Sequence, residues 1–158
     1  MVSTYPLMKE EKISSWIPTK RSDFFTSDQL IDAYLHGKRD AFAATQRLAV
    51  DKLSNNIEKS GDISINLLKT LSANHFTPIN AYLRVNDLDN FDIMVTVPED
   101  DIISDEFLNM YDIVSKMEAK NKEEYYDVFI SFCPVNEHFE EINVSSDGYL
   151  LKLAQNGE

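Results

Sequence analysis

The feature that most constrains the fold is a change in the period of the hydrophobic pattern near Pro78. Before it, over residues 27–71, apolar side chains recur every three or four positions, as in amphipathic helices. After it they alternate with polar side chains in two runs: Ile79, Ala81, Leu83 and Val85, then Phe91, Ile93, Val95 and Val97. Two such runs around the turn-forming residues 86–90 predict a hairpin with one buried face. Helices therefore precede a sheet.

The helical part contains its own start and stop signals. A capping-box pattern at Thr26 predicts a helix start. The pattern then continues to Ser60-Gly61, where a left-handed glycine would end a helix, so we expect two helices or one kinked helix. A further short helix, capped by Asp62 or Ser64, should end before Pro78.

The C-terminal half predicts a helix between two strands. Acidic residues follow Pro98, where a helix N-terminus favours negative charge. The expected inner stripe of this helix is Phe107, Met110, Tyr111, Val114 and Met117. A strand over residues 126–132 should then be parallel to the preceding one, with a right-handed crossover, and should end at Pro134. A short strand over 149–153 follows the turn signal at residues 145–148.

The predicted fold class is α+β: N-terminal helices followed by a small mixed sheet of about four strands with one crossover helix. Residues 1–26 lack clean periodicity but contain aromatic side chains, so they are interpreted as an N-terminal arm that packs on a single domain of residues 27–158. A chain of 158 residues is long enough to bury a sizeable core.

Cysteine content and hydropathy indicate a compartment. The single cysteine, Cys133, excludes an intramolecular disulfide and a cysteine-based zinc site, which fits a reducing environment. The first eight residues lack a basic region followed by an apolar one, and no stretch approaches the roughly 18 apolar residues of a membrane helix. We therefore expect a cytoplasmic protein.

The charge distribution bears on partners. The net charge is −12, and residues 98–158 hold fifteen acidic but only four basic side chains. Such a surface repels phosphate backbones and anionic lipids, so we expect no nucleic-acid and no membrane binding. A basic protein partner is favoured. The alternative is an acidic face that only keeps the protein in solution.

Few residue patterns suggest catalysis. The chain has neither a GxGxxG motif nor a P-loop. Cys133, at the end of a predicted strand, is interpreted as a buried structural thiol. His36 and His75, both near expected helix ends, suit capping or dipole roles better than catalysis. Four candidate metal ligands lie within five residues (Glu137, His138, Glu140 and Glu141), but their spacing matches neither HExxH nor an EF-hand, so an acidic surface loop is the alternative.

One pair of carboxylates merits a hypothesis. Asp92 and Asp127 lie on the two strands predicted to be parallel, each between apolar neighbours. If these strands are adjacent, both side chains could approach on one face and hold a divalent cation such as Mg²⁺. Strand alternation alone would also place both aspartates outward on half-buried strands, with no further role.

The order of helix, strand, strand, helix, strand over residues 62–132 resembles the minimal core of the nucleotidyltransferase superfamily. The resemblance implies an acidic pair at Asn90 and Asp92, with a third acid at Asp127, that binds metal for nucleotidyl transfer. Where that family has a Gly-Ser turn, this sequence has Val85-Asn86-Asp87-Leu88.

Three hypotheses about function follow. The leading one is a non-catalytic protein-binding, adaptor or regulatory module, for example an inhibitor of a basic toxin, with no cofactor. The second is a metal-dependent nucleotidyltransferase-like enzyme, or a degenerate relative, that uses Asp92 and Asp127. The third is an oligomeric structural subunit assembled through the amphipathic helices of residues 27–57.

Overall fold

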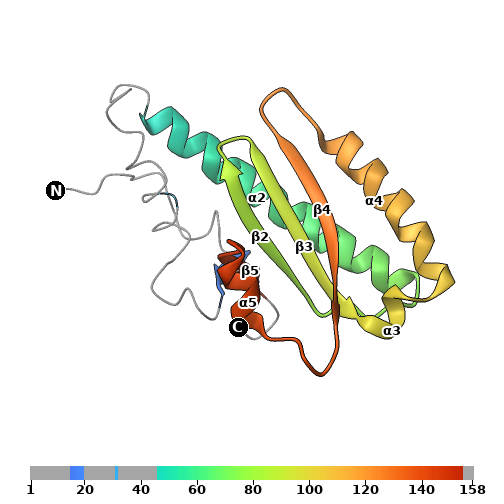
Figure 1. Cartoon of the computed structure of the whole chain (residues 1–158). Helices are drawn as coiled ribbons and strands as arrows, with labels where there is room; N and C mark the ends of the chain where they lie inside the picture. Colours follow the sequence, from blue (N-terminus) through green and yellow to red (C-terminus); the bar gives the residue numbers. More distant parts are fainter. Residues whose placement is uncertain (1–14, 20–30, 32–45, 155–158) are drawn as a thin grey trace.

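A computed structural model describes residues 15–19, 31 and 46–154 (Figure 1). It is an α+β structure, as predicted. The elements in chain order are β1 (Trp16–Pro18), α2 (Gln46–Ala73), β2 (Asn80–Asp87), β3 (Asn90–Pro98), α3 (Glu99–Ile102), the 3₁₀ helix η4 (Asp105–Phe107), α4 (Leu108–Asn121), β4 (Asp127–Val135), α5 (Glu141–Ser146) and β5 (Leu151–Leu153). The predicted helix start at Thr26 and the interpretation of His36 lie outside the described residues.

The strands form one mixed sheet in the order β1-β5-β2-β3-β4. The hairpin is confirmed, because β2 and β3 pair antiparallel with Leu83 opposite Ile93. The parallel pairing of β3 and β4 is also confirmed, with Ile93 opposite Ile130. About four strands were expected; the additional one is β1, which pairs antiparallel with β5. Trp16 of β1 is buried, so this part of the N-terminal segment does pack on the sheet.

Helix α2 crosses one face of the sheet and forms the main core with it (Figure 1). The predicted break at Ser60-Gly61 is wrong, because α2 is a single helix of 28 residues. Ser60 stays in the helix by donating its hydroxyl to the carbonyl oxygen of Asn56, at 2.9 Å, and by bonding the Tyr126 hydroxyl at 2.7 Å. The helix ends instead at Ala73, and His75, two residues later, has a left-handed φ of 71°. The interpretation of His75 as a residue at a helix end is confirmed.

Gly61 does not end the helix but allows the N-terminal segment to approach it closely. A Cβ atom at this position would lie 3.0 Å from the Cβ of Ser15 and 3.2 Å from Nε1 of Trp16. The indole of Trp16 donates to the carbonyl oxygen of Ile57 at 3.0 Å, one turn earlier in α2. Any larger residue would force Ser15 or Trp16 to shift, so glycine is favoured where the N-terminal segment crosses the helix.

Around β2 the second face of the sheet is also covered, so the expectation that the hairpin has one buried face is wrong, although Phe129 of β4 is exposed on that second face. Tyr82, Val144 and Tyr149 form a small separate core between this face and α5. Helix α5 has only six residues, too few to produce a periodic pattern, and the sequence there predicts only a loop and a turn. The turn itself is present at Gly148, whose φ is 98°.

The segment between β3 and β4 is more divided than predicted. It consists of α3, η4 and α4 in place of one helix, although α4 does end at Asn121 as expected. Phe107, Met110 and Val114 are buried as predicted, whereas Tyr111 is 47% exposed. Strand β4 continues through Pro134, because it is the last strand of the sheet and needs no N–H on its outer side there. Within the described residues, no helix combines the length and the apolarity that crossing a membrane requires.

Candidate functional site

The register of β3 and β4 decides how the two predicted aspartates lie. Asp92 is opposite Phe129, and Asp127 is opposite Asn90. The two carboxylates are therefore offset by two residues along adjacent strands, on the same face of the sheet. Each is bound to a different cationic side chain.

Asp92 is buried and holds Arg84 of the neighbouring strand. The Arg84 side chain donates to one Asp92 oxygen through both Nε, at 3.0 Å, and a terminal nitrogen. Its other terminal nitrogen donates to the carbonyl oxygen of Asp147, the C-cap of α5, at 3.0 Å. The guanidinium carbon also lies 4.8 Å from the centre of the Tyr149 ring. Hydrogen bonding to Asp92 raises the pKa of Arg84. Asp92 thus orients an arginine that fixes the end of α5 to the sheet.

Asp127 is exposed at the start of β4, where its carboxylate lies 3.2 Å from Nζ of Lys122. Asn90, the position that the superfamily resemblance pairs with Asp92, is exposed opposite Asp127. Among the described residues, no group of three or more His, Cys, Asp or Glu side chains is arranged to hold a metal ion.

The other candidate ligands also separate. Glu141 accepts from the Tyr82 hydroxyl at 2.7 Å and pairs with Lys152 at 3.3 Å, so it fastens α5 to the sheet. Glu137, His138 and Glu140 are exposed. Cys133 is half-buried rather than buried, and this burial raises the pKa of its thiol.

A different surface is built by α3, η4 and the first turns of α4. No lysine or arginine occurs between Arg84 and Lys116. Acidic side chains are concentrated there, and the exposed ones are Glu99, Asp100, Asp105, Glu106 and Asp112. Three large apolar side chains are exposed among them: Ile103 by 71%, Leu108 by 66% and Tyr111 by 47%. We call these eight residues the acidic-apolar surface.

The apolar part of this surface rests on a rigid support. The Tyr111 ring makes edge contacts with the rings of Phe107 and Phe132, at centroid distances of 5.6 Å and 5.7 Å. Phe107 and Phe132 in turn contact each other at 4.9 Å. Because Phe107 is fully buried, the exposed edge of Tyr111 is held by the core. Leu108 lies three residues earlier on the same face of α4.

The sequence contained part of this information. The acidic run is visible in the sequence and favours a basic partner, but the hydrophobic pattern places Tyr111 in the inner stripe of the helix and indicates no role for Ile103 or Leu108. A signal was present, since Leu108, Tyr111 and Ser115 follow helical spacing one position away from the buried stripe of Phe107, Met110 and Val114. Periodicity alone cannot decide which of two adjacent apolar stripes faces the core.

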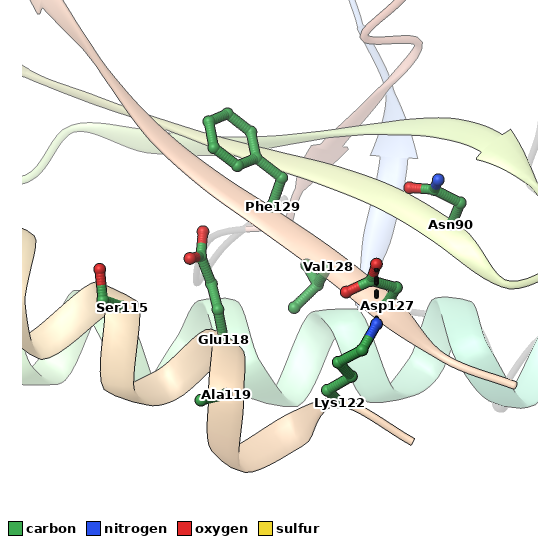
Figure 2. A pocket seen from close by; sticks show the side chains of 8 residues that line it. All are labelled: Asn90, Ser115, Glu118, Ala119, Lys122, Asp127, Val128 and Phe129. Atoms are coloured by element: carbon green, nitrogen blue, oxygen red, sulfur yellow. Dashed lines mark ion pairs between the residues drawn. The ribbon is translucent and has the colours of Figure 1, made fainter. Parts of the chain in front are cut away.

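A hollow lies between the C-terminal half of α4 and the beginning of β4. It has a volume of about 360 Å³ and is lined by residues of α4, of the start of β4 and of their surroundings: Ser115, Glu118, Ala119, Lys122, Asp127, Val128, Phe129 and Asn90 (Figure 2). Glu118 points from α4 towards the strand, and its carboxylate accepts from the backbone N–H of Ile130 at 2.7 Å. The Phe129 ring is 58% exposed on the strand above it.

Comparison of the chain with protein-family models, with curated proteins and with solved structures gave no match.

Proposed function

We propose that this protein is a non-catalytic protein-binding module whose acidic-apolar surface engages a basic protein. The observation that carries the proposal is the exposure of Ile103, Leu108 and Tyr111 within a segment free of basic residues. An aromatic and two aliphatic side chains provide the area that a partner can bury, and the surrounding carboxylates attract a partner of positive charge. A surface that served only solubility would not need three exposed large apolar side chains within the same short segment.

The described side chains support binding rather than chemistry. The buried carboxylate Asp92 is committed to Arg84, and Glu141 to Tyr82 and Lys152. Both contacts fix α5 in place. In contrast, the apolar side chains of the acidic-apolar surface expose area that packs against no other described part of the protein and can contact a partner.

The test uses the protein as bait to capture partners from a lysate of the native host, and compares variants at two leucines of similar exposure. Leu108→Ser removes an apolar contact from the proposed surface, and Leu48→Ser removes one from α2, where Leu48 is 71% exposed. We expect wild type and Leu48→Ser to retain the same basic protein at low salt, and Leu108→Ser to retain about tenfold less, the equivalent of losing one buried leucine side chain. The bound protein should be released at high salt.

Two results would refute the proposal. One is the absence of any captured protein at low salt. The other is a partner that Leu108→Ser and Leu48→Ser retain equally, or that stays bound without change at high salt. Thermal unfolding of both variants should match wild type, because neither side chain is buried.

A further inference from the structure

We propose that the free edge of β4 binds an extended segment of the basic partner, which adds a strand to the sheet beside α4. This inference rests on the proposed function and specifies how the partner is bound. It starts from the position of β4, which is the last strand of the sheet, with no described strand on its outer side.

The orientation of the β4 backbone is fixed by two hydrogen bonds. The N–H of Asp127 donates inward, to the carbonyl oxygen of Asp89 at 2.8 Å. The N–H of Ile130 donates outward, to Glu118 of α4. Backbone groups alternate along a strand, so Val128 and Phe132 also direct their N–H and C=O groups outward. The free edge therefore offers donors and acceptors at every second residue up to Pro134, which has no N–H.

Side chains of α4 and β4 border the place that an added strand would occupy. Helix α4 lies beyond β4 on the side away from β3 (Figure 1), so Ser115, Glu118 and Ala119 of α4, which line the hollow, border the place of the next strand. Tyr111 and Leu108 of the acidic-apolar surface lie earlier in the same helix. The exposed Phe129 ring provides a contact on the opposite face of the sheet (Figure 2).

The charge of Glu118 favours a basic segment as the added strand. Glu118 forms no ion pair with any described lysine or arginine, and the lysine that lines the hollow, Lys122, is already paired with Asp127. A lysine or arginine of the added strand would therefore meet the Glu118 carboxylate. A second copy of this chain is disfavoured, because pairing two β4 edges would bring two Glu118 carboxylates and two acidic-apolar surfaces together.

Glu118 also protects the edge in the free protein. An exposed strand edge invites uncontrolled pairing, and a charged side chain across it is one way in which proteins prevent this. To bind a strand here, the partner must displace Glu118 from the N–H of Ile130 and offer it a cation in exchange. This exchange disfavours neutral strands and favours basic ones.

The experiment uses the full chain labelled with ¹⁵N and a synthetic peptide of about ten alternating lysine and valine residues, the length that matches a nine-residue strand. We expect the peptide to shift the amide resonances of Val128, Ile130 and Phe132 and to slow the hydrogen exchange of Val128 and Phe132. A peptide of the same sequence with alternate backbone nitrogens methylated keeps its charge but cannot pair, and should bind at least about tenfold more weakly.

A variant tests the protective role without any partner. Glu118→Ala should speed hydrogen exchange at Ile130 about tenfold in the free protein, because the N–H loses its acceptor. Asp112→Ala, which removes an exposed carboxylate from the same helix, is the matched control and should leave exchange at Ile130 unchanged.

The outcomes separate this inference from the proposed function. If both peptides bind equally and shift only amides of residues 99–112, the acidic-apolar surface binds basic chains but strand addition is wrong. If the peptide shifts no amide on either surface, the inference of strand addition is wrong, and the capture experiment alone decides the proposed function. Light scattering that shows a dimer, with slowed exchange of the β4 amides in the free protein, would replace the basic partner with a second copy and overturn the inference.

Discussion

At the scale of single residues, several buried polar groups connect different elements of the fold. Tyr126 illustrates this: its ring is fully buried, stacks on Phe91 at 5.6 Å, and its hydroxyl bonds Ser60 of α2 at 2.7 Å. Burial raises the pKa of Tyr126 to about 12, from an ordinary value of 10.0. The hydroxyl that links the residue before β4 to α2 is thus also a group that couples stability to pH.

We predict that the protein loses stability as the pH rises from about 10 to about 12. In this window the unfolded chain releases the Tyr126 proton while the folded chain retains it, so the free energy of unfolding falls with increasing pH. The contribution of Tyr126 is about 2–3 kcal/mol. Denaturant unfolding at a series of pH values measures it.

Tyr126→Phe should be less stable than wild type at neutral pH, by about 1 kcal/mol for the lost hydrogen bond to Ser60. It should also show a shallower decline above pH 10, since its titrating group is gone. Part of the decline should remain, because burial also raises the pKa of Tyr82 and of Tyr149. Tyr125→Phe, at the exposed neighbouring residue, is the matched control. Equal slopes for Tyr126→Phe and wild type would contradict the prediction.

At the scale of secondary-structure elements, the sequence predicted those whose hydrophobic pattern is long. The β2–β3 hairpin, the parallel strand β4 and the end of α4 at Asn121 all followed from periodicity and turn residues. Two elements were not predictable in this way. Strand β1 and helix α5 have three and six residues, and both are held by tertiary contacts: Trp16 by α2, and α5 by Arg84 and Glu141.

The wrong prediction of a helix end at Gly61 and the candidate metal site at Asp92 have the same physical explanation. Gly61 was interpreted as a helix stop because glycine is costly inside helices, yet it is there to admit Trp16. Likewise, Asp92 was interpreted as a candidate ligand because it lies on a strand between apolar residues, but its partner Arg84 is set by sheet register. A local sequence pattern does not reveal which residues from distant segments a given residue contacts.

We predict that Gly61→Val separates the N-terminal segment from α2. The added side chain would meet Ser15 and Trp16 at distances that require one of them to move, and should cost about 1–3 kcal/mol. Trp16 is the single tryptophan of the chain, so its fluorescence should shift to longer wavelength as the ring leaves the core. Asn66→Val, at an exposed position of the same helix, controls for the effect of a β-branched residue. An unshifted emission maximum in Gly61→Val would show that the segment accommodates the side chain.

At the scale of the whole molecule, the chain carries a net charge of −12 and must stay folded without a partner. The acidic excess after residue 97 repels itself in the free protein, and a basic partner would relieve this repulsion. The proposed function therefore implies that the charge which favours binding weakens folding, a compromise that is common at binding sites.

We predict that salt acts in opposite directions on folding and on binding. Raising sodium chloride from about 0.05 M to about 0.5 M shortens the screening length from over 10 Å to about 4 Å, so repulsion among the carboxylates of residues 98–158 weakens. The melting temperature should rise by about 2–4 °C, equivalent to about 1 kcal/mol for a chain of this size. Over the same range, affinity for the alternating lysine–valine peptide should fall at least about tenfold. A neutral peptide of alternating serine and valine provides the control and should bind weakly at both salt concentrations. A melting temperature that falls with salt would mean that attractive ion pairs, such as those of Lys122 and Lys152, outweigh the repulsion, and would contradict the prediction.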